Sequence, residues 1–415
     1  MGNLPTLVPM KSREHYAMNQ RTHKVRNRAA VLAAIAGLAV LAAGCGSEGL
    51  SVPSAADGSG TPSHAGGVSI PQPNPSSSPP GDQGFVSPAE EQAGADSRSG
   101  VTGGALFGGN GPLAQVDAKL GRRLAVVREY YHIGEKFPTP ENKQLMASGS
   151  TLLVSLDAQP GQGPSYASIA AGQEDAFISA FLKTMNQDAI TYHLGAIYIC
   201  FEHEADNPIH MKLGSPSEFV RAWDHVHQLA ASEHLDWNTG GRLHWVLILE
   251  HTAYFRDLPL FLRNGGGGVN SYWPGTNEVD IVGADGYNHI GCKKRGQPGS
   301  AGVTGGSSSL TPEAIFDPVV SFAHAHGGLP VFIAEWGSQA FNTSGSLSGE
   351  QPAFIGQMRA YVSANHEIAG AMYWDSRSPE NPGCSSIINN QPASVSALAA
   401  MGHSAGLQGR LVDPS

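Results

Sequence analysis

Hydrophobic positions follow two alternating patterns from Gly104 onward. Short, continuous apolar runs alternate with longer stretches in which apolar residues recur at helical spacing. The apolar runs are Ala105–Gly108, Leu124–Tyr130, Thr151–Leu156, Ala196–His203, Leu243–Glu250, Val279–Tyr287, Val331–Glu335 and Gly370–Asp375. The helical stretches include Glu174–Gln187, Ser217–Ser232, Pro312–His326 and Glu350–Asn365. Continuous apolar strands separated by helices are typical of a parallel sheet that is covered on both faces.

Eight such strand and helix units within about 300 residues predict an α/β fold, a closed (β/α)₈ barrel of the TIM type. An open, doubly wound sheet is the alternative that the same pattern allows. We expect the barrel domain to occupy residues 104–402 and a C-terminal tail to occupy residues 403–415.

A basic leader and an apolar segment precede the barrel. Ala29–Gly44 holds only apolar or small residues, and it is shorter than the ~20 residues that a membrane-spanning helix needs. The segment ends in Leu41–Cys45, which resembles the lipobox of bacterial lipoproteins, in which the cysteine thiol accepts a lipid. We therefore interpret residues 1–45 as a lipoprotein signal peptide and expect anchoring to the outer face of a bacterial cell membrane through Cys45. An ordinary signal peptide and an N-terminal anchor helix are the alternatives.

A segment rich in small and polar residues separates Cys45 from the barrel. Among residues 46–103, 31 of 58 are Gly, Ser or Pro, and Phe85 is the one aromatic residue. Such a composition buries too little apolar surface to offset the entropy of the chain, so we expect a disordered linker.

Charge and cysteine usage narrow the possible partners and the compartment. The formal net charge is −10, and the basic leader carries more positive than negative residues, so the remainder is more acidic still. An acidic chain is a poor nucleic-acid binder, because affinity for phosphates depends on Lys and Arg. In an oxidising compartment we expect a disulfide between Cys292 and Cys384, with two unpaired loop thiols as the alternative. We expect Cys200 to be a buried thiol. The sequence implies no metal and no organic cofactor.

Ionisable and aromatic residues gather where the predicted strands end. Glu202 and Glu204 follow the fourth strand, and Glu335 ends the seventh. The sixth strand carries Asp285 and Tyr287, and Trp336 and Trp374 stand at the ends of the seventh and eighth. In a barrel of this kind the carboxyl ends of the strands form the active-site face. Two carboxyl groups and aromatic rings on one rim are what a glycoside hydrolase needs.

Several of these segments resemble glycoside hydrolase family 26, a family of retaining barrel glycosidases. The resemblance covers about Gly104 to Asp375, through Phe201-x-His203-Glu204, the helix from Phe219 to His227, the stretch from Tyr272 to Asn288, and Ile333–Ser338. It implies that Glu204 is the acid/base and that Glu335 is the nucleophile. It also implies that Tyr287 hydrogen-bonds the nucleophile, that His203 orients the acid/base and that Trp374 forms the floor of a sugar subsite.

Trp336 and Asp285 complete the predicted substrate-binding set, although Asp285 could equally form a structural hydrogen bond. Glu202 is the alternative acid, because a strand with period two would place it on the same face as Glu204.

The chain also departs from the family pattern near the predicted acid/base. Cys200 stands where the family has Arg, and Ala205 and Asp206 replace Met and Asn. No aromatic platform follows, and the third strand ends in Asp157 where an aromatic residue is often found. These departures put the specificity for mannan in question.

The sequence as a whole predicts an exported, lipid-anchored retaining glycoside hydrolase that cleaves a β-linked polysaccharide by double displacement. β-Mannan is the substrate that the resemblance implies, and β-1,3-xylan and mixed-linkage β-glucan are alternatives. Two other classes stay open: a non-catalytic carbohydrate-binding lipoprotein on a degenerate barrel, and a two-lobed solute-binding lipoprotein.

Overall fold

The computed structural model describes residues 98–114, 117–255, 267–288, 309–340, 349–377, 385–388 and 391–412. The predicted lipid acceptor Cys45 and the predicted disulfide partners Cys292 and Cys384 lie outside the described residues, as does the linker up to residue 97. Cys200 is a free, buried cysteine, as predicted.

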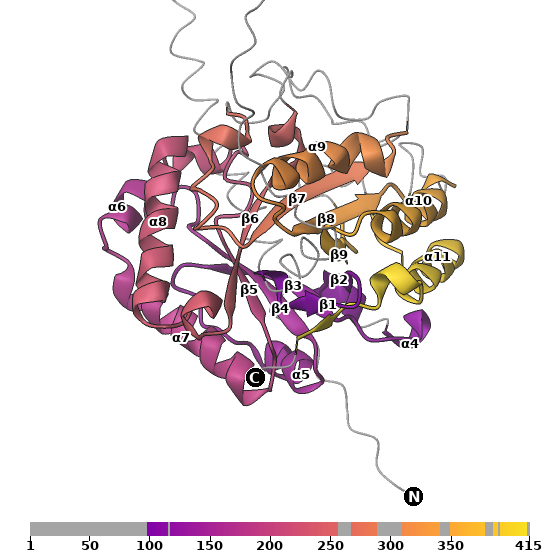
Figure 1. Cartoon of the computed structure of the whole chain (residues 1–415), viewed down its shortest axis with the longest axis horizontal. Coiled ribbons are helices and arrows are strands. Elements are labelled where there is room, and N and C mark those ends of the chain that lie inside the picture. Colours follow the sequence, from indigo (N-terminus) through magenta and orange to yellow (C-terminus); the bar gives the residue numbers. More distant parts are fainter. Residues whose placement is uncertain are drawn as a thin grey trace, which may run out of the picture. The chain divides into compact units, whose positions relative to one another are not determined.

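Eight parallel strands close into a barrel in the order in which they occur in the chain (Figure 1). They are β2 (Leu106–Asn110), β3 (Val126–His132), β4 (Thr151–Asp157), β5 (Ile197–Phe201), β6 (Leu243–Glu250), β7 (Ile281–Asn288), β8 (Val331–Ser338) and β9 (Ile368–Tyr373). The first strand pairs with the last, with Leu106 opposite Gly370, so the sheet has no open edge. The (β/α)₈ barrel prediction is confirmed, and the closure excludes both the open sheet and the two-lobed alternative.

Helices surround the barrel, and most of them lie between successive strands (Figure 1). Between β6 and β7 the described residues form only the short 3₁₀ turns His251–Tyr254 and Val269–Ser271. The helices include α5 (Pro140–Ala147), α6 (Tyr166–Ala170), α7 (Asp175–Thr191), α8 (Pro216–Ser232), α9 (Pro312–Ala325), α10 (Glu350–Ala364) and α11 (Pro392–Gly402), with the short α3 (Gly111–Ala114) and α4 (Asp117–Leu120) after β2. Local sequence sets where α8 begins. The Ser215 side chain accepts from the Glu218 N–H, the Glu218 carboxylate accepts from the Ser215 N–H, and Pro216 opens the helix.

Side-chain alternation along the strands divides the core into two layers. One cluster fills the inside of the barrel and includes Val126, Leu153, Ile248 and Phe332. The larger cluster packs the outer faces of the strands against the helices. Because successive residues of a strand point to opposite faces, each strand contributes to both layers.

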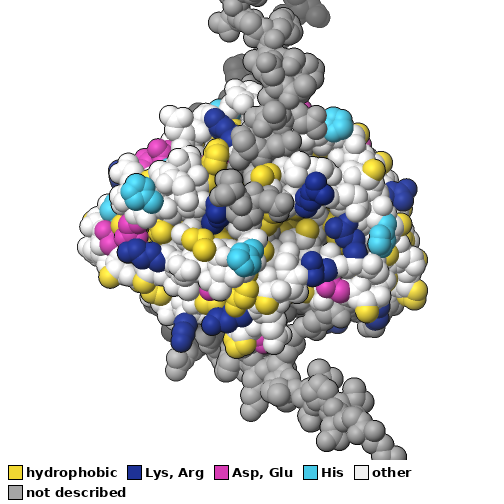
Figure 2. Space-filling model, turned by 60° about the horizontal axis from the view of Figure 1, so that its bottom comes forward, with side chains coloured by type: hydrophobic (Ala, Val, Ile, Leu, Met, Phe, Trp, Pro, Cys, Tyr) yellow, Lys and Arg dark blue, Asp and Glu magenta, His cyan; other side chains and the backbone are white. Residues whose placement is uncertain are grey.

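A short pair of strands lies beyond the boundaries that the sequence predicted for the barrel domain. β1 (Val101–Thr102) pairs antiparallel with β10 (Arg410–Leu411), and Val412 N–H donates to the Gly100 carbonyl at 2.8 Å. The folded domain therefore includes residues on both sides of the range 104–402. Within the described ranges, no helix is both long and apolar enough to cross a membrane. On the surface, Lys and Arg side chains are interspersed with hydrophobic ones on the face that Figure 2 presents.

Candidate active site

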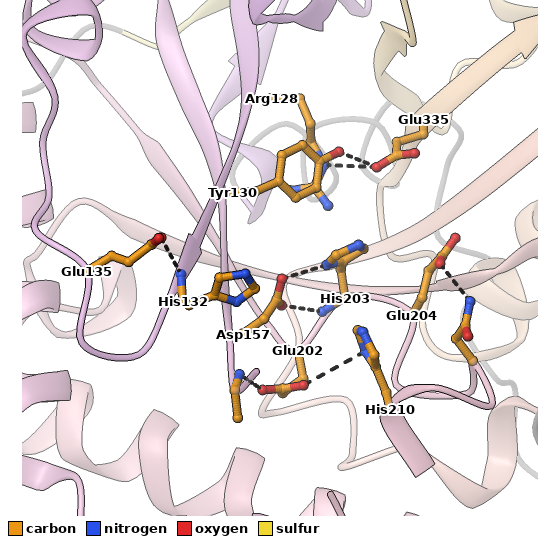
Figure 3. A network of polar contacts seen from close by, with 12 residues as sticks. Arg128, Tyr130, His132, Glu135, Asp157, Glu202, His203, Glu204, His210 and Glu335 are labelled. Carbon is orange, nitrogen blue, oxygen red and sulfur yellow. Dashed lines mark hydrogen bonds and ion pairs between the residues drawn. The ribbon is translucent and has the colours of Figure 1, made fainter. Parts of the chain in front are cut away.

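The predicted catalytic glutamates lie at the carboxyl ends of two barrel strands, where the barrel fold builds active sites. Glu335 belongs to β8, and Glu204 lies in the turn that follows β5. A network of polar side chains surrounds both residues (Figure 3).

A β-bulge in β8 directs Glu335 into the barrel. Phe332 pairs with Gly283 and Ile333 with Ala284, but Glu335 pairs with Asp285, so Ala334 is an extra residue. The same extra residue separates the pairing of β8 with β9. Phe332 faces the interior, and unbroken alternation would turn Glu335 outward toward the helices. The bulge shifts the alternation by one residue, and Glu335 then points inward beside Asp285.

Three donor groups surround the carboxylate of Glu335. The hydroxyls of Tyr130 and Tyr287 donate to its two oxygens, one to each. The Nε of Arg128 lies 4.0 Å from Oε1. Burial raises the pKa of both tyrosines well above its ordinary value, and the neighbouring Glu335 adds to the rise, so both phenols stay neutral donors. These groups fix the orientation of a carboxylate that is only 7% exposed.

Arg128 supplies a buried positive charge beneath this carboxylate. Its guanidinium lies 4.4 Å from the centre of the Tyr130 ring, and the side chain is almost completely buried. Burial favours the neutral form of Arg128, but Tyr130, Asp285 and Glu335 outweigh it and raise the pKa. Burial raises the pKa of the Cys200 thiol on β5, and the charge of Arg128 acts on the same thiol in the opposite direction with a smaller effect.

Sequence reasoning did not single out Arg128 or Tyr130. Their spacing could have indicated them. Two polar residues that are two positions apart at the end of an apolar run point to the same face of the strand. In Figure 3 both side chains extend toward Glu335.

Glu204 is half-buried and sits in a tight turn. Its φ is +49°, in the left-handed region that non-glycine residues seldom adopt, and its N–H donates to the Ile248 carbonyl at 2.9 Å. The Asn207 Nδ2 donates to Glu204 Oε2 at 3.2 Å and also to Glu250 Oε1 at 3.0 Å. Asn207 thus holds two carboxyl groups side by side, one from the turn and one from the end of β6.

Burial is the largest cause that raises the pKa of Glu204 to about 8, and the charges of Glu250 and Glu335 raise it further. His203 and the Asn207 hydrogen bond act in the opposite direction. Near neutral pH, Glu204 therefore carries a proton that it can donate. A carboxylic acid kept protonated near neutrality beside a second, oriented carboxylate is the arrangement that general acid catalysis requires.

Two contacts with the carboxylate of Asp157, at the end of β4, fix the position of His203. Its Nδ1 lies 2.9 Å from Asp157 Oδ2, and its N–H donates to Asp157 Oδ1 at 3.1 Å. Burial lowers the pKa of His203, but the charge and hydrogen bond of Asp157 outweigh burial and raise it. Burial in turn raises the pKa of Asp157, and His203 outweighs burial and lowers it. The ring of His203 packs edge-on to Tyr130, with 5.2 Å between the ring centres.

Comparison with known proteins is limited to distant structural similarity. No family model matches the chain, and no curated protein matches it. Among solved structures, the chain is similar to several glycoside hydrolase family 26 endo-β-mannanases. An endo-β-1,4-mannanase from Cellulomonas fimi is 15% identical with a TM-score of 0.48, covering 76% of this chain and 75% of its own. The catalytic domain from Bacillus sp. JAMB-750 is 12% identical with a TM-score of 0.48, covering 76% and 90%. The Podospora anserina β-(1,4)-mannanase is 14% identical with a TM-score of 0.46, covering 81% and 69%.

The sequence predicted that Glu202 and Glu204 share one face of a strand, and the structure shows that they do not. β5 ends at Phe201, and Glu202 itself has a φ of +56°. Its side chain is completely buried, where it accepts from the Ala158 N–H and from the Tyr166 hydroxyl, the latter at 3.4 Å. It therefore has no surface on which to meet a substrate.

The two tryptophans of the rim differ in position. Trp374 is half-buried, and its ring lies 5.6 Å from that of Tyr130 at 87°, which places it beside the Glu335 network. The prediction that Trp336 binds substrate is wrong. Its ring is fully buried and packs against Tyr373 and Phe354 of α10, because the residue after an inward-facing Glu335 points outward.

Asp285 lies beside Glu335 in the barrel but is only 2% exposed. Burial raises its pKa well above the ordinary value, and the charge of Glu335 adds to the rise. No hydrogen-bond partner for its carboxyl oxygens is found among the described residues, and the charge of Arg128 acts on it. Its burial leaves little surface for contact with a sugar, and the structural hydrogen bond that was the alternative is not found among the described residues either.

Proposed function

We propose that this protein is a retaining glycoside hydrolase that acts on a β-linked polysaccharide. The observation that carries the proposal is the pairing of a protonated Glu204 with a Glu335 whose carboxylate is oriented by two tyrosines and an arginine. Glycoside hydrolysis with retention needs one carboxyl group that donates a proton and a second that attacks the sugar.

In the first step, Glu335 attacks the anomeric carbon while Glu204 transfers its proton to the glycosidic oxygen. The bond between that carbon and oxygen breaks, and the leaving sugar departs with the proton. A covalent glycosyl-enzyme then links Glu335 to the remaining sugar. In the second step, ionised Glu204 takes a proton from water, the water oxygen attacks the same carbon, and Glu335 is released.

The pKa of about 8 suits Glu204 for both steps. It holds the proton at neutral pH before the first step, and the nearby negative charge of Glu335 contributes to that. Once Glu335 carries the sugar, its charge is gone, so the pKa of Glu204 falls and the group can act as a base.

β-Mannan is the substrate that we propose first, because the residues that resemble family 26 include the Glu204, Tyr287 and Glu335 segments. β-1,3-Xylan and mixed-linkage β-glucan are the next candidates. Asp157 behind His203, and the lack of aromatic residues in the segment after Asn207, give reasons to screen beyond mannan.

The test is a hydrolysis screen on these three polysaccharides with the mature chain and its Glu335→Ala and Glu204→Ala variants. We expect reducing sugar to form, NMR of the first product to show the β-anomer, and both variants to lose about a thousandfold or more in kcat. Activity that Glu335→Ala leaves intact, or a first product with the α-anomer, would contradict the proposal.

A non-catalytic carbohydrate-binding role is the second candidate, and the observation that favours it is Cys200 at the position of the family Arg. Binding of a polysaccharide without hydrolysis, at equal strength in the protein and in Glu335→Ala, would support this alternative.

We also propose that the protein is exported and anchored to the outer face of a bacterial membrane by a lipid on Cys45. Growth with radiolabelled palmitate tests this. We expect label in the protein and none in the Cys45→Ala variant, and an unlabelled protein would contradict the anchor.

A further inference from the structure

A concavity of about 610 Å³ opens at the amino ends of several barrel strands, away from Glu204 and Glu335. Its walls include Arg122 and Arg123 before β3, Gly149 before β4, and Leu194 before β5. The other wall is formed by residues 408–412, which include β10. We call this part of the surface the basic end. In a parallel barrel the amino and carboxyl ends of the strands lie at opposite ends, so the basic end lies opposite the candidate active site.

The charged residues that line the concavity are basic. Arg122, Arg123 and Arg410 contribute to it together with His193 and His403, and none of its lining residues, all of them described, is acidic. Arg122 is partly occupied, because its guanidinium donates to the carbonyls of Gly402 and Leu407. Arg123 and Arg410 are exposed, and Arg123 also interacts with the charge of Asp117. This local charge contrasts with the net charge of −10 of the whole chain.

Exposed apolar side chains flank the same concavity. Large hydrophobic residues with strong exposure are few in the described ranges. Among them, Val412 is 44% exposed and Ile190 is 46% exposed. Val412 lines the concavity, and Ile190 lies near the end of α7, two residues before the lining residue Tyr192. Basic groups mixed with exposed apolar side chains are typical of surfaces that bind anionic membranes.

The chain also enters the barrel beside the basic end. In the β1 and β10 pair, Thr102 lies opposite Arg410 and Val101 lies opposite Leu411. Residues 46–97 connect this point to Cys45, so the part of the chain that carries the proposed lipid joins the domain next to Arg410.

We propose that the basic end docks on the anionic phospholipid headgroups of a membrane. Phosphate groups pair with Arg123 and Arg410, while Val412 and Ile190 enter the interface between headgroups and acyl chains. Docking in this orientation turns the carboxyl ends of the barrel strands, with Glu204 and Glu335, away from the lipid and toward polysaccharide outside. The inference does not depend on the hydrolytic reaction, and its test includes no activity measurement.

The test measures binding of residues 45–415, carrying Cys45→Ser so that no lipid is attached, to vesicles by co-sedimentation. One set of vesicles contains phosphatidylglycerol and phosphatidylcholine, and the other contains phosphatidylcholine alone. We expect binding to the anionic vesicles at low salt and its loss at high salt, because screening shortens the reach of the charges. The Arg123→Gln/Arg410→Gln variant should bind about thirtyfold more weakly, which corresponds to about 1 kcal/mol for each arginine.

The matched control removes two exposed arginines from the helical surface, Arg221→Gln on α8 and Arg359→Gln on α10. The net charge then changes by the same amount, so binding by overall charge and binding by the basic end give different results. We expect the control to bind like the parent protein, and we expect Ile190→Ser/Val412→Ser to bind more weakly than the parent at low salt. Equal binding to neutral vesicles, no binding to anionic vesicles, or equal losses in the two arginine pairs would overturn the proposal.

Discussion

Replacing Glu250 with Gln tests whether a neighbouring carboxylate keeps Glu204 protonated. Glu204 and Glu250 both accept from the Asn207 Nδ2, at 3.2 and 3.0 Å, so their bonded oxygens are no more than about 6 Å apart. Two unit charges about 6 Å apart interact by about 2.8 kcal/mol at an effective dielectric of about 20, equivalent to about two pKa units. Glu250 is half-buried, and water screens part of this interaction. We therefore expect Glu250→Gln to lower the pKa of Glu204 by about one unit.

The charges around Glu204 come from several elements. His203 and Asp206 belong to its own turn, Glu250 ends β6, Asp285 lies on β7 and Glu335 lies on β8. His203 acts against the other groups, which are all carboxyl groups. Because Gln keeps the size and the hydrogen-bond acceptor of Glu250, the variant removes one of these charges and leaves the Asn207 contact in place.

The assay is the pH dependence of kcat/KM, whose basic limb reports the acid of the free enzyme. Glu204 must be protonated to donate, so activity falls as the pH rises through its pKa of about 8. In Glu250→Gln the basic limb should move about one pH unit lower, while activity on the acid side changes little. The control Glu313→Gln removes an exposed charge from α9 and should leave the limb where it was.

A second readout needs no activity. The folded pKa of Glu204 is raised above the ordinary value of 4.5, so its contribution to stability is present below pH 4.5 and is lost as the pH rises toward 8. As the pH rises across this window, the free energy of unfolding of Glu204→Gln should therefore increase relative to that of the parent. The same relative increase should be smaller when both proteins also carry Glu250→Gln. An unmoved basic limb together with identical gains in the two backgrounds would refute the reasoning.

Four further substitutions test other parts of the site. Arg128→Met removes the buried charge beside the nucleophile, and we expect kcat to fall about a hundredfold with KM nearly unchanged in steady-state assays. Asp157→Asn breaks a buried ion pair and should cost about 3 kcal/mol in urea unfolding. That cost should be largest between about pH 4 and 6.5. The contribution of Asp157 to stability is lost as the pH falls through its lowered pKa, and the contribution of His203 is lost as the pH rises through its raised pKa. Glu202→Gln should keep polysaccharide hydrolysis within about threefold of the parent rate, and a thousandfold loss would show that Glu202 is the general acid. Trp336→Ala should lower the free energy of unfolding by about 3–5 kcal/mol with KM unchanged, and a raised KM would return the residue to the substrate site.

Local sequence predicts the barrel well because its signal is local. Each strand is a short apolar run, and in each long helix apolar residues recur at helical spacing. Both patterns can therefore be found without knowledge of distant residues. The predicted run Leu243–Glu250 has the bounds of β6, and the predicted helix Ser217–Ser232 begins one residue inside α8. The number of units favoured a closed barrel but also allowed an open sheet, and the pairing of Leu106 with Gly370 decides for closure.

The ends of the predicted strands located Glu204, Glu335 and Tyr287, and the resemblance to family 26 supplied their expected roles. The structure brings Tyr287 into hydrogen-bond contact with Glu335. Arg128 and Tyr130 escaped notice because they come from β3, far from β8 in the chain, and nothing in their own strand indicates which neighbour they meet.

By itself, the sequence determined the number and order of the barrel strands and the carboxyl groups at their ends. Only the tertiary structure decided which carboxyl groups face the site. Strand alternation alone would turn Glu335 outward and would place Glu202 beside Glu204. The pairing of β8 with β7 and β9 inserts Ala334 as a bulge and turns Glu335 inward, and the end of β5 at Phe201 buries Glu202 while Glu204 stays open. Register and strand ends are set by neighbouring strands, and no residue carries that information in its own local pattern.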